Sequence, residues 1–334
     1  MYRRRKNDMK SNDIVTGNSL IIGKACSGKT TAINNYIKEL AKDNNMKIFS
    51  VNLYGENKSL LENLCANDVT TCAYNPYKMP KINGFMEQTQ LNILNYKIDF
   101  LIRIHELVKG CKFTNNEKIL LGRLLQIMYA KPHLNEQDIY DIVKQDVNFT
   151  KEAIENIRNA AIHIKNSQIL CSSKHFYHDD IGKYNENNNL TALCIEKLKA
   201  FESELKIQKL CYLDFVYCQM LNYNYSNPET KSVLIIDDIL DFIGDDEYIF
   251  DQLYLILKRC RMLNGFVVCT TSATNPFLVK EYEYLYKIIS TCKNIELFAV
   301  SKDEIKFLND GFPDDKNLIN KAAKLKMGEH ISFQ

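Results

Sequence analysis

The sequence contains no tryptophan and no long apolar run. No stretch reaches the roughly 18 consecutive apolar residues that would cross a bilayer, so we expect no membrane-spanning helix. The first residues, MYRRRKNDMKSND, are basic but carry no apolar segment, and we therefore expect no secretory signal. The formal net charge is only +2, so the composition gives no general indication of nucleic-acid binding, although a local basic patch stays open.

The eleven cysteines include no C-x-x-C pair and follow no regular spacing. This arrangement argues against a disulfide framework. Scattered cysteines are typical of a reducing compartment, where the thiol packs as a small apolar residue. We therefore expect a cytoplasmic protein.

The length of 334 residues exceeds the usual size of one hydrophobic core, so one domain with an insertion, or two subdomains, is expected. Residues 1–17 are polar and predict a flexible arm. Residues 18–84 and 222–334 alternate short apolar strands with amphipathic helices, which predicts an α/β core with a mostly parallel sheet covered on both faces. Residues 85–221 show apolar spacings of three and four, which predicts an all-helical insertion.

A glycine loop lies near the start of the predicted core. Gly23 to Thr30 reads GKACSGKT and matches G-x-x-x-x-G-K-[ST] between a predicted strand and a predicted helix. Glycines let the backbone N–H groups turn toward phosphates, and the helix adds its positive end. Lys29 is expected to bridge the β- and γ-phosphates, and Thr30 to ligate Mg²⁺. The predicted nucleotide contacts are Gly23, Lys24, Ala25, Cys26, Ser27, Gly28, Lys29, Thr30 and Thr31.

Two aspartates end the later apolar run SVLII. Asp237 is expected to hold the Mg²⁺ shell, and Asp238 stands where many ATPases place a glutamate that polarises the attacking water. Aspartate is shorter by one methylene, on the order of 1.5 Å. A base misplaced by that distance can cost about a hundredfold in rate. The two motifs predict ATP and Mg²⁺ as ligands and an ATP hydrolase, and the shorter side chain of Asp238 leaves slow turnover open.

Taken in order along the chain, these motifs resemble the FtsK–HerA superfamily of hexameric ATPases. Within it, the sequence is most similar to the ATPase domain of the conjugative type IV secretion ATPases, the VirB-four-like and TraC-like proteins. The further segments that carry this resemblance are NLYGENKSL, TTCAYNPYKM, LKRCRMLNGFVVCTT, KNIELFAVSKDEIKFL and LKMGEHISF. The resemblance implies a RecA-like P-loop fold, and it covers nearly the whole chain.

The chain departs from that family at three points. A Thr-Gln pair usually follows the third core strand, where the glutamine senses the γ-phosphate; here the pair is Thr270-Thr271, so Thr271 is expected to sense it weakly. Asp238 replaces the usual glutamate. We also expect no counterpart of the family's large N-terminal domain. The resemblance further implies an arginine that reaches the neighbouring subunit's phosphate, with Arg259 and Arg261 as candidates.

The resemblance implies a ring-forming motor, expected to be a hexamer, that energises conjugative transfer of DNA or protein. Its expected partners are further copies of the chain and membrane secretion-channel components, which would place it peripherally at a membrane. An ATP-binding assembly factor or switch with little hydrolysis stays open, because Asp238 and Thr271 depart from the pattern. A small-molecule kinase is a weaker alternative, and a preference for GTP also stays open.

Several other patterns are interpreted as structural. Cys171, His175, His178 and Asp179 have spacings that could suit zinc, but we expect a polar surface loop. The basic residues of one predicted helix, Lys151, Arg158 and Lys165, are expected to be solvated. Tyr54 gives only a weak indication of a contact with the base.

Overall fold

The computed structural model describes residues 16–53, 55, 57–64, 66–68, 87–130, 141–142, 149–166, 188–194, 202–226, 229–259, 264–272 and 279–333. The chain divides into two compact units, which we describe separately. The sheet unit comprises residues 1–70, 183–199 and 216–334, and the helical unit comprises residues 71–182 and 200–215. Of the predicted flexible arm, all but the last two residues lie outside the described part of the chain.

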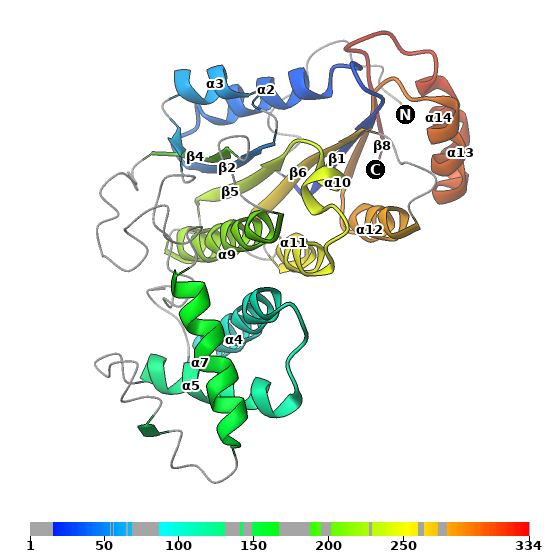
Figure 1. Ribbon diagram of the computed structural model, residues 1–334. Coiled ribbons are helices and arrows are strands. Elements are labelled where there is room, and N and C mark those ends of the chain that lie inside the picture. The colour runs from blue at the N-terminus through cyan, green and yellow to red at the C-terminus, as the bar shows by residue number, and fades with distance from the viewer. Residues whose placement is uncertain are drawn as a thin grey trace. The chain divides into compact units, whose positions relative to one another are not determined.

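The sheet unit is built on one sheet of eight strands in the order β3-β4-β2-β5-β6-β1-β7-β8 (Figure 1). Neighbouring strands run parallel, except that β8 is antiparallel to β7. Their apolar sequences suit burial on both faces, as parallel sheets require. The strands are β1 (Ser19–Gly23), β2 (Met46–Asn52), β3 (Asn67–Asp68), β4 (Leu190–Cys194), β5 (Lys231–Ile236), β6 (Gly265–Ser272), β7 (Asn294–Leu297) and β8 (Ile331–Phe333).

Helices cover both faces of this sheet (Figure 1). One face packs on α2 and α3, where Ile33 and Ile37 join a buried cluster with Ile21, Val233 and Val268. The other face carries α10, α11 and α12 together with the last part of α9. The helices of the sheet unit are α2 (Lys29–Leu40), α3 (Lys58–Asn63), α9 (Glu202–Ser226, from residue 216), α10 (Ile239–Ile243), α11 (Glu247–Arg259), α12 (Val279–Ile289), α13 (Lys302–Gly311) and α14 (Lys316–Ala322).

Asn18 sets the start of the central strand β1. Its side-chain Nδ2 donates to the carbonyl of Leu257 at 2.8 Å, and its Oδ1 accepts from the N–H of Val267 at 3.0 Å. Its own carbonyl accepts from the N–H of Lys293 at 2.8 Å. One buried asparagine therefore joins the end of α11, strand β6 and the residue before β7.

One strand lies inside the range that the sequence predicts to be all-helical. β4 pairs with β2 and β3 in the sheet, so the prediction of helix throughout residues 85–221 is wrong at this segment. The run LTALC is short and apolar, and such a run cannot be assigned to helix or strand by periodicity alone. The edge of β2 decides the outcome, because it offers a parallel partner for five consecutive residues of β4.

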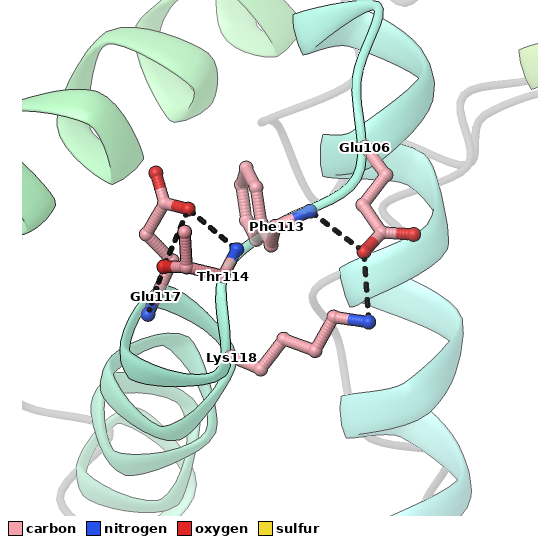
Figure 2. Close-up of polar contacts among 5 residues, drawn as sticks. All are labelled: Glu106, Phe113, Thr114, Glu117 and Lys118. Carbon is pink, nitrogen blue, oxygen red and sulfur yellow. Dashed lines mark hydrogen bonds and ion pairs between the residues drawn. The ribbon is translucent and has the colours of Figure 1, made fainter.

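Within its described residues, the helical unit contains α4 (Glu87–Lys109), α5 (Asn115–Ala130), α7 (Lys151–Asn166) and the start of α9. Figure 2 shows the α4–α5 turn. The N–H of Glu117 donates to Thr114 Oγ1 at 3.2 Å, and the N–H of Thr114 donates to Glu117 Oε2 at 2.7 Å, which forms a capping box. Glu106 accepts from the N–H of Phe113 at 2.9 Å and pairs with Lys118 at 3.0 Å.

A buried ion pair joins α4 to α9 within the helical unit. Lys97 Nζ lies 2.5 Å from Asp214 Oδ2, and both side chains are fully buried. The hydroxyl of Tyr96 donates to Asp214 Oδ1 at 2.9 Å. The aspartate thus satisfies two donors, and removing it would leave a cation without its counter-charge in the core.

We predict that Asp214→Leu lowers the free energy of unfolding by about 3–5 kcal/mol, because Lys97 then stays buried and unpaired. The double variant Lys97→Met/Asp214→Leu should regain most of that loss, since both charges are gone. Urea unfolding followed by far-UV circular dichroism measures both. Equal midpoints for the single and double variants would contradict the prediction.

Candidate nucleotide site

The segment Gly23–Thr30, which the sequence predicts to bind phosphate and which we call the phosphate loop, connects β1 to α2 and depends on two glycines. A Cβ at Gly23 would lie 2.8 Å from both Phe298 Cβ and Ser27 Oγ, which leaves no room for a side chain. Gly28 has φ +106°, in the left-handed region that glycine adopts without strain. The two motif glycines therefore stand where the backbone requires them.

The start of α2 is suited to an anion. This helix has 12 residues, and no side chain of the described residues caps it at Gly28. Its first N–H groups have no partner within the helix, and the helix dipole adds positive charge there. Lys24, Ala25 and Cys26 are exposed in the loop, and Thr30 is half-buried in the first turn.

Lys29 turns back toward the loop. Its Nζ donates to the carbonyl of Gly23 at 2.6 Å and to that of Lys24 at 3.0 Å, and the side chain is only 7% exposed. Burial lowers the pKa of the Lys29 ammonium, while the negative charges of Asp238, Asp237 and Glu304 oppose that shift. The lysine thus lies within electrostatic reach of both aspartates named from the sequence.

The two aspartates follow β5 directly and are held by Thr270. Asp237 is buried, and Asp238 is half-buried with φ +57° at the start of α10. The hydroxyl of Thr270 donates to Asp237 Oδ1 at 2.5 Å and accepts from the backbone N–H of Asp238 at 2.8 Å. One hydroxyl on the neighbouring strand β6 therefore orients both acidic residues.

Sequence reasoning missed this role of Thr270, because it assigned the functional hydroxyl of the pair to Thr271. Thr271 is buried, and its Oγ1 has no hydrogen-bond partner among the described residues. Successive residues of a strand point to opposite faces, so Thr271 faces away from Thr270. It lies beside Ile22 in the register of β1 and β6. The parallel pairing of β5 with β6 could have revealed this role, because it places Thr270 of β6 near the end of β5.

The backbone of the phosphate loop also bonds to two segments near the C-terminus. The N–H of Lys24 donates to the carbonyl of Ala299 at 2.9 Å, and the N–H of Gly328 donates to the carbonyl of Ser27 at 3.0 Å. Ala299 follows β7, and Gly328 precedes β8. The segment LKMGEHISF, quoted above only for its resemblance, therefore supports the phosphate loop.

Of the other candidate residues named from the sequence, Arg259 lies in the described part of the chain. Arg259 is the last residue of α11; it is exposed, and its Nη1 lies 3.5 Å from the hydroxyl of Tyr217. Arg261 lies outside the described residues, as do Tyr54 and the zinc candidates Cys171, His175, His178 and Asp179. Among the helices of the described part, none has the length and apolar character needed to cross a membrane.

No family model matches the chain, and no curated protein matches it significantly. Among solved structures, VirB4 of Thermoanaerobacter pseudethanolicus is similar with a TM-score of 0.62 and 15% identity, over 95% of this chain and 88% of that one. The plasmid coupling protein TrwB in complex with ADP and Mg²⁺ is similar with a TM-score of 0.51 and 11% identity, over 92% of this chain and 78% of that one.

The chain has the RecA-like P-loop NTPase fold. The predicted fold class, an α/β core with a mostly parallel sheet and helices on both faces, is confirmed. VirB4 and TrwB are themselves conjugative ATPases of the FtsK–HerA type, the family that the sequence resembles. At this identity the likeness shows the fold alone.

We predict that Thr270→Val lowers the free energy of unfolding by about 1–3 kcal/mol, because the half-buried N–H of Asp238 and the buried carboxylate of Asp237 each lose a partner. Thr270→Ser keeps the hydroxyl and should retain most of the stability. Urea unfolding compares the two variants. A valine variant as stable as the serine variant would show that the hydroxyl does not hold the aspartates.

Proposed function

We propose that the chain is a Mg²⁺-dependent ATPase of the FtsK–HerA type, a ring-forming motor that energises conjugative or type IV secretion transfer of DNA or protein. The observation that carries the proposal is the convergence of three features at one edge of the sheet. These are the uncapped start of α2, the buried Lys29, and the Asp237–Asp238 pair held by Thr270. Together they supply donors for phosphate, a cation and paired carboxylates.

The residues present fit Mg·ATP. Among the described residues, Lys29 Nζ donates to two carbonyls of its own loop, and a phosphate would replace them with a stronger, charge-assisted partner. Thr30 and Asp237 would hold Mg²⁺, which neutralises charge on the phosphates when it is bound. Asp238 would orient the attacking water as general base. Loop residues 24–26 and Thr31 are exposed, so the phosphates of a nucleotide could reach the loop from solvent.

Assembly into a ring, expected to be a hexamer, follows from the sequence resemblance to hexameric ATPases. In such a ring Arg259 or Arg261 would reach the phosphate of the neighbouring subunit and stabilise charge in the transition state. The exposure of Arg259 at the end of α11 supports its candidacy. The likeness to VirB4 and to the plasmid coupling protein TrwB supports a place at a membrane secretion channel, on its cytoplasmic side.

A second candidate is an ATP-binding assembly factor or switch with little or no hydrolysis. Two observations favour it. Asp238 has a shorter side chain than the usual glutamate, and Thr271 lies on the face of β6 opposite to the aspartates. Binding would then need only Lys29, Thr30 and Asp237.

Nucleotide binding can be measured without any turnover through Cys26. This thiol is exposed in the phosphate loop, whereas Cys111 is exposed in the helical unit and serves as the internal control. We predict that Mg·ATP slows alkylation of Cys26 several-fold, because the bound phosphates cover the loop, and leaves Cys111 unchanged. Peptide mass spectrometry reads both sites in one sample. Protection should vanish in Lys29→Ala; equal alkylation of Cys26 with and without nucleotide would contradict binding at this loop.

Hydrolysis separates the two candidate functions. For the motor we predict phosphate release that rises as light scattering reports assembly and that is lost in Lys29→Ala. Asp238→Glu should raise the rate, by up to about a hundredfold, because it restores the reach of the base. Binding without turnover in the natural chain, with turnover gained in Asp238→Glu, would instead establish the switch.

A further inference from the structure

A short turn near the C-terminus touches the phosphate loop. We call Lys326–His330 the Met327 turn. Its Gly328 donates to the carbonyl of Ser27 at 3.0 Å, and a Cβ on Gly28 would lie 3.2 Å from both Cα and N of Gly328. The contact therefore falls on the two loop residues that directly precede α2.

The Met327 turn is held in one shape. The N–H of Glu329 donates to the carbonyl of Lys326 at 3.0 Å, and the carboxylate of Glu329 accepts from the N–H of Lys326 at 3.0 Å. His330 is buried and stacks on Phe298, with ring centroids 5.3 Å apart. Immediately afterwards β8 pairs with β7. Whatever the turn presents to solvent is thus fixed relative to the phosphate loop.

What the turn presents is an apolar side chain. Met327 is 78% exposed, the most exposed of the large apolar side chains in the described part of the chain. Gly328 beside it has φ +80°, and a Cβ there would meet nothing within 4 Å. Methionine is flexible and polarisable, and it makes favourable contacts with aromatic rings. An exposed methionine next to the phosphate loop, with open space at the adjoining Gly328, is suited to an aromatic ligand group.

The order of the strands indicates which part of a nucleotide would reach this turn. The aspartates follow β5, which is separated from β1 by β6, and they would meet the terminal phosphate and its Mg²⁺. The Met327 turn lies between α14 and β8, on the other side of β1 (Figure 1). A nucleotide whose terminal phosphate points toward β5 extends its nucleoside away from β5. The nucleoside therefore lies on the side of β7 and β8.

We propose that the Met327 turn is the nucleoside subsite, with Met327 packed on the face of a purine base. The inference rests on the proposed nucleotide site and adds the part that recognises the nucleoside. Recognition by one apolar side chain uses the ring face rather than the pattern of hydrogen-bonding groups on its edge. Met327 should therefore serve ATP and GTP alike.

The test compares Mg·ATP, Mg·GTP and magnesium tripolyphosphate, which has phosphates but no nucleoside, by protection of Cys26 in the full chain. Met327→Ser should weaken ATP and GTP about tenfold, and leave tripolyphosphate unchanged, because only the base contact is lost. Met327→Leu, which keeps an apolar side chain, should retain most of the affinity. Tyr286→Ser removes another exposed apolar group, on α12, and should change none of the three.

The outcomes separate this inference from the proposed function. Unchanged ATP affinity in Met327→Ser would overturn the nucleoside subsite and leave the phosphate site standing. Equal weakening of ATP and tripolyphosphate would also overturn it, since the substitution would then have disturbed the loop. A loss of assembled mass in light scattering, with unchanged ATP affinity, would assign Met327 to a contact between copies. Failure of the natural chain to bind all three ligands would overturn both proposals.

Discussion

The structure depends on the position of β1 in the interior of a parallel sheet. This strand pairs with β6 on one side and with β7 on the other, and its last residue, Gly23, lies against Phe298 just after β7 and against Ser27 of its own loop. At Gly23 a single added carbon would collide with Phe298 and Ser27. The chain must therefore leave the sheet through glycine, turn at once and start α2. That turn leads the chain directly into the start of α2, and the start of a helix is a favourable place for an anion.

Both flanks of β1 contribute to the site, in different ways. On the β6 side Thr270 orients two carboxylates through one hydroxyl, and the carboxylates reach Lys29 electrostatically. On the β7 side Ala299 and Gly328 bond to the backbone of the phosphate loop. The first flank provides two carboxylates within electrostatic reach of a buried lysine. The second fixes the loop and places Met327 beside it.

Local patterns in the sequence were informative wherever the physics is local. Ser301 and Glu304, which lie in the segment KNIELFAVSKDEIKFL, form the capping box of α13, with reciprocal hydrogen bonds between side chains and backbone. The phosphate loop was recognisable for the same reason, since its glycines and lysine act within eight residues. The prediction at β4 was wrong because a short, mostly apolar run such as LTALC suits a strand or a helix equally well, and pairing with β2 made the choice.

The sequence by itself predicted the α/β class, the glycine loop and the paired aspartates, because hydrophobic period and motif spacing are properties of short segments. The RecA-like class was implied by the family resemblance. Only the tertiary structure decided that Thr270 rather than Thr271 meets the aspartates, and that Gly328 contacts the phosphate loop. These contacts join residues 33 and more than 300 positions apart. They follow from the order of the strands in the sheet. That order is set by which apolar faces and strand edges find each other in the folded chain, and no short stretch of sequence carries it.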